Sequence, residues 1–338
     1  MIASPISADI DFEKDGVQHG HLILPHSHDS SAWGKIMIPI TVIQNGKGPT
    51  ALITGANHGD EYEGPIALHD LALTLQANEI NGRVIIVPAF NFPAFIAGTR
   101  TSPIDKGNLN RLFPGRPDGS VTEKIADYFQ RYLLPMADVV LDFHSGGRTL
   151  DFIPFAAAHI LEHRSQQAAC LAARNAFNAP FSMIQLEIDN TGLYDTAAEE
   201  MGKTFVSTEL GGGGSATARS IAIAKKGLRN FLVHARILQG SLTLEPSVEI
   251  HMPDVDCFTF AKFEGLFEPM FDLGDPVQEG DIVARIWPKN HTGQAPENCY
   301  AYRSGILVGR HFPGLISIGD CALVIAEIIG EVDLSTLR

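Results

Sequence analysis

Apolar runs of strand length alternate with helical segments across residues 36–240 of the chain. The run DVVLDF, residues 138–143, is almost continuously apolar, as expected for a strand that is covered on both faces of a sheet. This alternation predicts an α/β domain with a mostly parallel or mixed sheet flanked by helices. We expect strands at residues 36–43, 50–56, 82–90, 138–143 and 203–210, and helices at residues 64–76, 121–137 and 160–177.

The pattern changes after about residue 240. Short apolar segments separated by Gly and Asp turns follow, and no long helical pattern is evident. We therefore expect a smaller all-β domain at the C-terminal end. The predicted division is a β-rich N-terminal segment over residues 1–35, a central α/β domain over 36–245 and a C-terminal β domain over 246–338.

Composition excludes several classes of partner. The formal net charge of −14 argues against nucleic acid or an anionic membrane as a partner. The four cysteines lie far apart and form no CxxC pair, which predicts reduced thiols. The N-terminus has no signal-peptide pattern, and no apolar run approaches the ~20 residues that a membrane span needs. We expect a cytoplasmic protein with no membrane partner, and a homo-oligomer is compatible with the sequence.

Three predicted strands end in side chains that can bind a metal or transfer a proton. TALITGA leads to His58 and Glu61, DVVLDF leads to His144, and KTFVST leads to Glu209. In open α/β sheets, sites form at the carboxyl ends of the strands. Glycines beside each group allow close approach of the backbone. These side chains are therefore expected to meet at one edge of the sheet.

The residue types fit a catalytic zinc site. Such a site has three protein ligands of the His and carboxylate kind, which leaves a position for water whose pKa falls toward ~7. A further carboxylate is needed as general base, and Glu209 is the candidate. Each residue alone has an ordinary alternative: a chance HxxE pair, a hydrogen-bonded histidine at a strand end, or a structural carboxylate. Their coincidence at three strand ends favours the metal site.

A long Pro- and Gly-rich segment, residues 91–119, carries the second group of candidates. Loops of this length in compact domains are usually functional. Asn110 and Arg111 suit a substrate carboxylate, and Arg100 can polarise a carbonyl and hold a developing oxyanion. For Arg116 we expect a surface ion pair with an acid.

Other polar residues have weaker assignments. For the histidines of QHGHLILPHSHD we expect surface or packing roles; they are His19, His21, His26 and His28. Asp142 lies two residues before His144, so both side chains point to the same side of the strand. Asp142 either orients His144 or forms a structural pair elsewhere.

The motifs HGDE, NLNRLFPG, DFHSGG and TELGGGG occur in an order that resembles the succinylglutamate desuccinylase/aspartoacylase family. That family has a zinc-carboxypeptidase-like fold, and the resemblance covers residues 50–215. It implies one Zn²⁺ per chain, held by His58, Glu61 and His144. It also implies Glu209 as catalytic base and substrate or oxyanion contacts from Arg100, Asn110 and Arg111. A longer spacing between Arg100 and Asn110 departs from the family pattern. No counterpart of the family's C-terminal tyrosine is assigned, and Tyr194, Tyr300 and Tyr302 are the candidates.

Residues 31–68, 98–105 and 207–214 resemble the branch of the family that deacetylates N-α-acetyl-L-2,4-diaminobutyrate in ectoine breakdown. The expected activity is hydrolysis of the amide of a small N-acyl amino acid. Three alternatives remain: a deacylase of the N-succinylglutamate or N-acetylaspartate type, a metallocarboxypeptidase, or a non-catalytic zinc or ligand-binding protein. A diaminobutyrate substrate would also need an acid near its ammonium, and the unranked candidates are Asp60, Glu63, Asp189 and Asp195.

Overall fold

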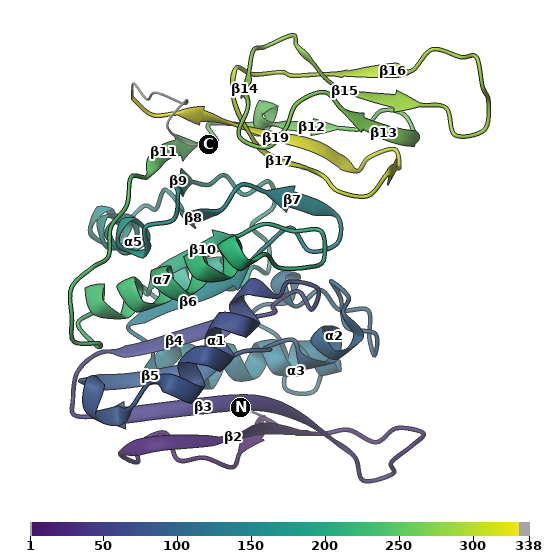
Figure 1. The fold of residues 1–338 in the computed structure, drawn as a ribbon. Helices are drawn as coiled ribbons and strands as arrows, with labels where there is room; N and C mark the ends of the chain where they lie inside the picture. The colour runs from purple at the N-terminus through teal and green to yellow at the C-terminus, as the bar shows by residue number, and fades with distance from the viewer. Residues whose placement is uncertain (1, 331–338) are drawn as a thin grey trace.

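One large mixed sheet runs through the molecule (Figure 1). The computed structural model describes residues 2–330. In spatial order the strands are β1 (Ser7–Ala8), β2 (Gly16–Pro25), β3 (Lys35–Asn45), β5 (Gly82–Val87), β4 (Thr50–Gly55), β6 (Val139–His144), β10 (Thr204–Glu209), β8 (Phe155–Ala158), β9 (Phe181–Ile184), β11 (Val248–His251), β19 (Cys321–Ile328), β17 (Gly305–His311) and β14 (Pro276–Val277). Beside this path, β7 (Leu150–Phe152) pairs with β17, and β12 (Phe258–Phe260) pairs with β19.

Helices cover the α/β part of the sheet. One apolar core includes residues of α1 (Glu63–Thr74), α5 (Arg164–Phe177) and α7 (Ala218–His234). A second core includes residues of α3 (Val121–Tyr128), η3 (Phe129–Leu133), α4 (Leu134–Met136) and α6 (Tyr194–Glu200). The remaining helical segments are α2 (Phe92–Ala97), η1 (Ala77–Glu79), η2 (Leu109–Arg111) and η4 (Val255–Cys257). Among the described residues, no helix is long and apolar enough to cross a membrane.

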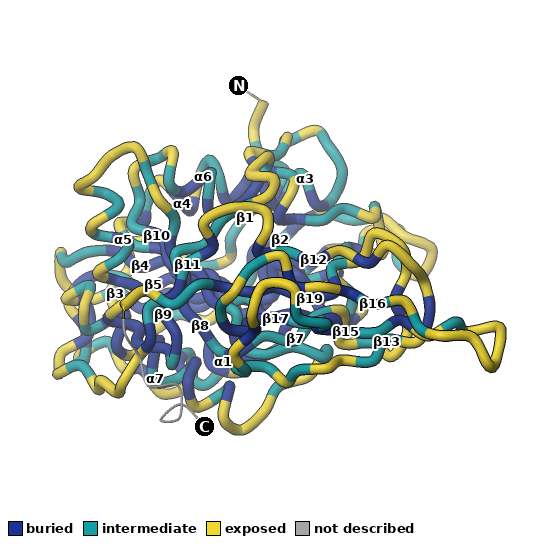
Figure 2. Tube along the Cα trace, turned by 90° about the horizontal axis from the view of Figure 1, so that it is seen from above, coloured by how far each residue is buried: buried dark blue, intermediate teal, exposed yellow. Residues whose placement is uncertain are grey.

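The central strands are apolar on both faces because each face packs on a different core. Leu52 of β4 and Val140 of β6 belong to one core, whereas Ile53 and Leu141, their next neighbours along the chain, belong to the other. Alternate residues of a strand point to opposite faces, so continuous apolar sequence follows from cover on both sides. The predicted α/β class with a mixed sheet is confirmed, and Figure 2 shows the buried residues gathered along the strands.

The pairing of three neighbouring strands brings their carboxyl ends together. β4 pairs in parallel with β6, and β6 pairs in parallel with β10. The register sets Glu209 opposite His144, both at the last position of their strands. The candidate residues of these strands are therefore neighbours in space, as expected from the sequence.

The C-terminal part is β-rich, as predicted. A separate four-stranded sheet has the order β16 (Glu297–Tyr300), β15 (Ile282–Trp287), β13 (Gly265–Pro269) and β18 (Leu315–Ile316). β11 also pairs in parallel with β9, and β17 pairs with β7, so hydrogen bonding continues from the α/β part into the β-rich part. The division at residues 35 and 245 stays a prediction.

Two helix predictions need correction. The segment predicted as one helix over 121–137 contains a π-helical turn at Phe129–Leu133 between two α-helical parts. The helix predicted from residue 160 begins at Arg164, and Leu161 N instead donates to Gln167 Oε1 at 3.0 Å. The longest helix, α7, is absent from the prediction.

Candidate functional site

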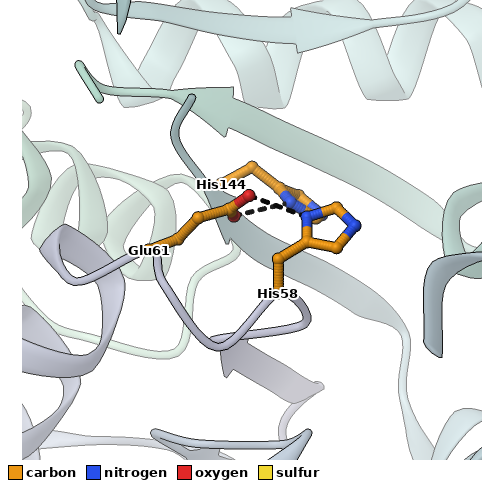
Figure 3. Close-up of side chains that lie close together, drawn as sticks. All are labelled: His58, Glu61 and His144. Carbon is orange, nitrogen blue, oxygen red and sulfur yellow. Dashed lines mark hydrogen bonds and ion pairs between the residues drawn. The ribbon is translucent and has the colours of Figure 1, made fainter. Parts of the chain in front are cut away.

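Three side chains converge at the end of β4 and β6 (Figure 3). His58 Nδ1 lies 2.7 Å from Glu61 Oε1, and His144 Nδ1 lies 2.9 Å from Glu61 Oε2. His58 and Glu61 are buried, and His144 is partly buried. Ser145 N also donates to Glu61 Oε2 at 3.2 Å. The three residues form a cluster that can hold a metal ion.

The loop from His58 to Glu61 is held against the segment that follows α2. Gly59 N donates to Thr99 O at 3.0 Å. A Cβ on Gly59 would lie 2.0 Å from the carbonyl carbon of Ala94, which no side chain can tolerate. A glycine is therefore required between His58 and Glu61 by this close approach of two backbone segments.

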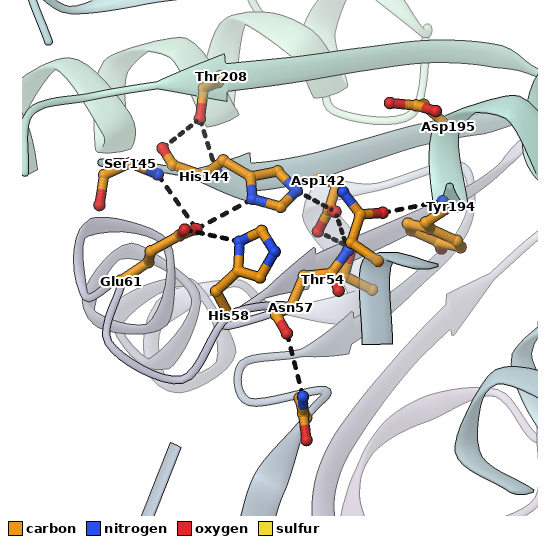
Figure 4. A network of polar contacts seen from close by, with 12 residues as sticks. Thr54, Asn57, His58, Glu61, Asp142, His144, Ser145, Tyr194, Asp195 and Thr208 are labelled. Carbon is orange, nitrogen blue, oxygen red and sulfur yellow. Dashed lines mark hydrogen bonds and ion pairs between the residues drawn. The ribbon is translucent and has the colours of Figure 1, made fainter. Parts of the chain in front are cut away.

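Asp142 holds the other side of the His144 ring (Figure 4). Its Oδ2 lies 2.9 Å from His144 Nε2. Thr54 Oγ1 donates to Asp142 Oδ1 at 2.6 Å, and Asn57 Nδ2 donates to Oδ2 at 3.0 Å. A carboxylate on the distal nitrogen fixes the orientation of a ligating histidine and makes it more basic. Asp142 therefore contacts His144, as the orienting role requires, and it also has structural hydrogen bonds to Thr54 and Asn57.

The pKa shifts of the cluster favour a neutral His58 and an ionised Glu61, which are the forms of these side chains that bind a metal ion. Burial lowers the pKa of His58 to about 4, and Arg100 acts in the same direction. Burial opposes ionisation of Glu61, but His58 and His144 hold its pKa below the ordinary value. Burial also opposes protonation of His144, yet Asp142 and Glu61 raise its pKa well above the ordinary value. A metal cation would supply the positive charge that Glu61 and Asp142 stabilise here.

The contact with Asp142 gives a first prediction. Asp142→Asn is expected to weaken the affinity of the cluster for a metal ion, tested here with Zn²⁺, by about 10- to 100-fold, because an amide supplies no negative charge to the His144 ring. Competition with a chromophoric chelator measures the affinity. Asp138→Asn is the matched control, since Asp138 lies beside the start of β6 and accepts from Thr50 N at 2.8 Å. Equal zinc affinity in the two variants would contradict the positioning role of Asp142.

Glu209 lies at the end of β10 beside His144. Its Oε2 is buried and has no hydrogen-bond partner among the described residues. Burial, together with the nearby Glu61 carboxylate, raises the pKa of Glu209 to about 8. A carboxylate with a free oxygen and a raised pKa next to a candidate metal cluster is the arrangement expected of a proton-transfer group.

A cavity of about 140 Å³ opens over these residues. We call it the central cavity. Its lining includes His58, His144, Glu209, Arg100, Asn110, Arg111, Leu150, Phe152, Gln185, Glu187 and Asp195. The structure therefore brings the loop residues proposed from the sequence to the same space as the strand-end residues.

The three loop residues differ in how they are held. Arg100 Nη1 lies 3.7 Å from Glu61 Oε1, and the Arg100 side chain is about half exposed. Asn110 is buried, and its Oδ1 accepts from Tyr194 N at 2.9 Å. Arg111 is exposed, and its Nη1 donates to Asn110 O at 2.6 Å. Arg100 thus faces the cluster despite the longer spacing before Asn110.

The tyrosine candidates do not reach the central cavity. Tyr194 is fully buried, and Tyr300 and Tyr302 are exposed on the C-terminal part. Among the described residues that line the cavity, none is a tyrosine.

Arg116 forms the surface ion pair that was expected for it: its side chain lies 2.8 Å from the carboxylate of Glu123.

Sequence reasoning missed Glu187, His159 and Glu199, which lie beside the cavity. Glu187 follows the short strand β9. The strand-end rule that identified His58 and Glu209 would have found Glu187, had the short segment Phe181–Ile184 been recognised as a strand.

Residues 47–235, which include every candidate metal ligand and Glu209, match the family model described as succinylglutamate desuccinylase/aspartoacylase catalytic domain. The chain belongs to the succinylglutamate desuccinylase/aspartoacylase family. The resemblance inferred from HGDE, DFHSGG and TELGGGG is thereby confirmed.

Related members of the succinylglutamate desuccinylase/aspartoacylase family cover nearly the whole chain. The N-alpha-acetyl-L-2,4-diaminobutyric acid deacetylase of Halomonas elongata is 55% identical over 328 residues, which is 96% of each protein. A product-bound structure of the ectoine utilization protein EutE from Ruegeria pomeroyi is 66% identical with a TM-score of 0.96, covering 97% of this chain and 100% of that one. A succinylglutamate desuccinylase/aspartoacylase from Rhodobacter sphaeroides is 36% identical with a TM-score of 0.92, covering 96% and 100%.

Proposed function

We propose that the protein is a zinc-dependent deacylase that hydrolyses N-α-acetyl-L-2,4-diaminobutyrate to L-2,4-diaminobutyrate and acetate, a step of ectoine degradation. The observation that carries the chemistry is the placement of Glu209 directly beside the cluster of His58, Glu61 and His144, with one carboxylate oxygen that no residue between 2 and 330 hydrogen-bonds. The 55% identity to the Halomonas elongata deacetylase over 96% of both chains supports the choice of substrate.

The donor set fits zinc. Two imidazole nitrogens and one carboxylate are the ligands of a catalytic zinc site with an open fourth position. The Nδ1 atoms of His58 and His144 both face Glu61, and the carboxylate of Asp142 contacts the other ring nitrogen of His144. We propose His58, Glu61 and His144 as the ligands of one Zn²⁺ per chain. When bound, zinc supplies a Lewis acid that polarises the amide carbonyl and makes water acidic.

The side chains of the protein provide proton transfer, stabilisation of the carbonyl oxygen and binding of the substrate carboxylate. Glu209 accepts a proton from the attacking water and returns it to the departing amine nitrogen, which balances the hydrolysis. Arg100, which faces the cluster, hydrogen-bonds the carbonyl oxygen as negative charge develops on it. Asn110 and Arg111 bind the α-carboxylate of the substrate. Asn110 Nδ2 is available for this purpose, because among the described residues the only hydrogen bond of the Asn110 side chain is the one that Oδ1 accepts from Tyr194 N.

The shape of the central cavity favours a small substrate over a peptide. Leu150 and Phe152 of β7 form part of its lining, and β7 is hydrogen-bonded to β17 of the C-terminal part. This wall supports a deacylase over the metallocarboxypeptidase alternative, because the chain of a peptide substrate must leave the cleft on the N-terminal side of the scissile bond. The carboxylate at Glu209 favours an enzyme over a non-catalytic binding protein.

The four cysteines are free thiols, which suits the reducing cytoplasm that we propose as the location. The function is tested by a product assay on the zinc-loaded protein, in which equal amounts of acetate and 2,4-diaminobutyrate are expected. A zinc-loaded protein that releases neither product would refute it.

A further inference from the structure

A second cluster of titratable side chains lies beside the central cavity and has no part in the steps above. We call it the acidic cluster; it consists of His159, Glu187, Asp195 and Glu199. His159 follows β8, Glu187 follows β9, and the two other acids lie on α6. Single ligand-type atoms of His159, Glu187 and Asp195 lie within 4.8 Å of one another. Glu187 and Asp195 both line the central cavity.

Negative charge exceeds positive charge in the acidic cluster. His159 Nδ1 lies 3.1 Å from Glu199 Oε1, and His159 Nε2 lies 3.6 Å from Glu187 Oε1. Burial opposes protonation of His159, but hydrogen bonding to Glu187 and Glu199 raises its pKa well above the ordinary value. One imidazolium therefore faces three carboxyl groups, and the cluster can accept a further cation.

Asp195 is the member of the acidic cluster whose carboxylate has an oxygen without a hydrogen-bond partner among the described residues. The residue is 8% exposed, and its Oδ1 accepts from the backbone and hydroxyl of Thr196. Its Oδ2 has no hydrogen bond or ion pair to any residue between 2 and 330 (Figure 4 draws it beside Tyr194). On a largely buried residue, an ionised carboxylate oxygen without a protein partner is stabilised when a cationic ligand pairs with it. Because this residue lines the central cavity, its missing partner is expected to come from the cavity.

The opposite charge is also present in the cavity. Arg100 and Arg111 line it, and Asn110 is joined to α6 by the hydrogen bond from Tyr194 N, the residue before Asp195. The central cavity thus contains both cationic groups and surplus carboxylates. Such a lining is complementary to a molecule that carries a carboxylate and an ammonium group close together.

We propose that Glu187 and Asp195 bind the side-chain ammonium of the substrate and thereby select N-acyl amino acids with a short cationic side chain. This inference rests on the deacylase function proposed above. The other three candidates are less suited: Asp60 accepts from Arg148 N at 2.8 Å, Glu63 accepts from Ser220 Oγ at 3.1 Å, and Asp189 is exposed. None of these three lines the central cavity.

The test compares two substrates that differ only in the ammonium group. N-α-acetyl-L-2,4-diaminobutyrate and N-acetyl-L-norvaline are isosteric, with a methyl group in the place of the ammonium. The readout is the ratio of their kcat/KM values with the zinc-loaded enzyme. We expect Asp195→Asn and Glu187→Gln each to lower this ratio by about 10- to 100-fold, because a charge-assisted hydrogen bond is lost. Asp189→Asn is the matched control and should leave the ratio within about twofold.

The outcomes separate the subsite from the proposed function. If the wild-type enzyme hydrolyses both substrates equally well, the deacylase function stands and the ammonium subsite is wrong. If both variants lose activity on the two substrates in parallel, the acids are structural and the subsite is again wrong. If the wild-type enzyme hydrolyses neither, the proposed function is refuted and the subsite with it. Elemental analysis adds a further check: a second zinc per chain that Asp195→Asn removes would overturn ammonium binding in favour of a metal.

Discussion

Glu209→Gln should lower kcat by about 10²- to 10⁴-fold while zinc content stays near one per chain. The amide cannot accept the proton of the attacking water or return it to the departing amine. The substitution should be well tolerated by the fold, because Glu209 Oε2 has no hydrogen-bond partner to lose among the described residues. Steady-state release of acetate and elemental analysis of the same sample measure the two quantities.

The control for Glu209→Gln is Glu200→Gln, which removes a carboxylate from the exposed end of α6. That variant should keep wild-type turnover. Near-normal turnover of zinc-loaded Glu209→Gln would remove Glu209 from the proposed role, and zinc loss in this variant would mean that Glu209 acts on the metal instead.

His144→Ala should reduce zinc content from about one per chain to less than about 0.1, and activity with it, because two protein ligands remain where a catalytic site has three. The substitution also leaves Asp142, which is 1% exposed, without its imidazole partner. His144→Gln is therefore examined in parallel, since its amide can still donate to Asp142. Both variants are measured by elemental analysis after dialysis against zinc.

His163→Ala is the matched control for His144→Ala, because His163 is exposed at the start of α5. It should retain full zinc content. Circular dichroism checks that each variant is folded. Full zinc occupancy in folded His144→Ala and His144→Gln would exclude His144 from the ligand set.

The placement of the candidate site was largely predictable because it depends on strand pairing. Parallel neighbours end at the same edge of a sheet, so apolar strands that end in His144 and Glu209 had to meet if β6 and β10 were adjacent. The sequence does not show which strands are neighbours in the sheet. The register that sets Glu209 of β10 opposite His144 of β6 appears only in the structure. The same holds for Asp142, whose two possible roles differ only in which partner lies within reach.

The missed elements have physical causes too. α7 has a capping pair at Thr217 and Ser220 and buried positions at Ile223 and Leu228, so the sequence does contain signals for this helix. The π-helical turn at Phe129–Leu133 has no comparable signal, because the local sequence also suits an ordinary helix. Glu187 was missed because a strand of four residues is too short to show alternation.

The most direct test of the account is a product assay on the zinc-loaded enzyme with N-α-acetyl-L-2,4-diaminobutyrate, N-acetylaspartate, N-succinylglutamate and short peptides as competing substrates. Released acyl group and free amino acid are quantified for each. We expect the first substrate to be hydrolysed with the highest kcat/KM and the peptides to release no C-terminal residue. A higher kcat/KM for N-acetylaspartate or N-succinylglutamate, or release of C-terminal residues from the peptides, would contradict the account.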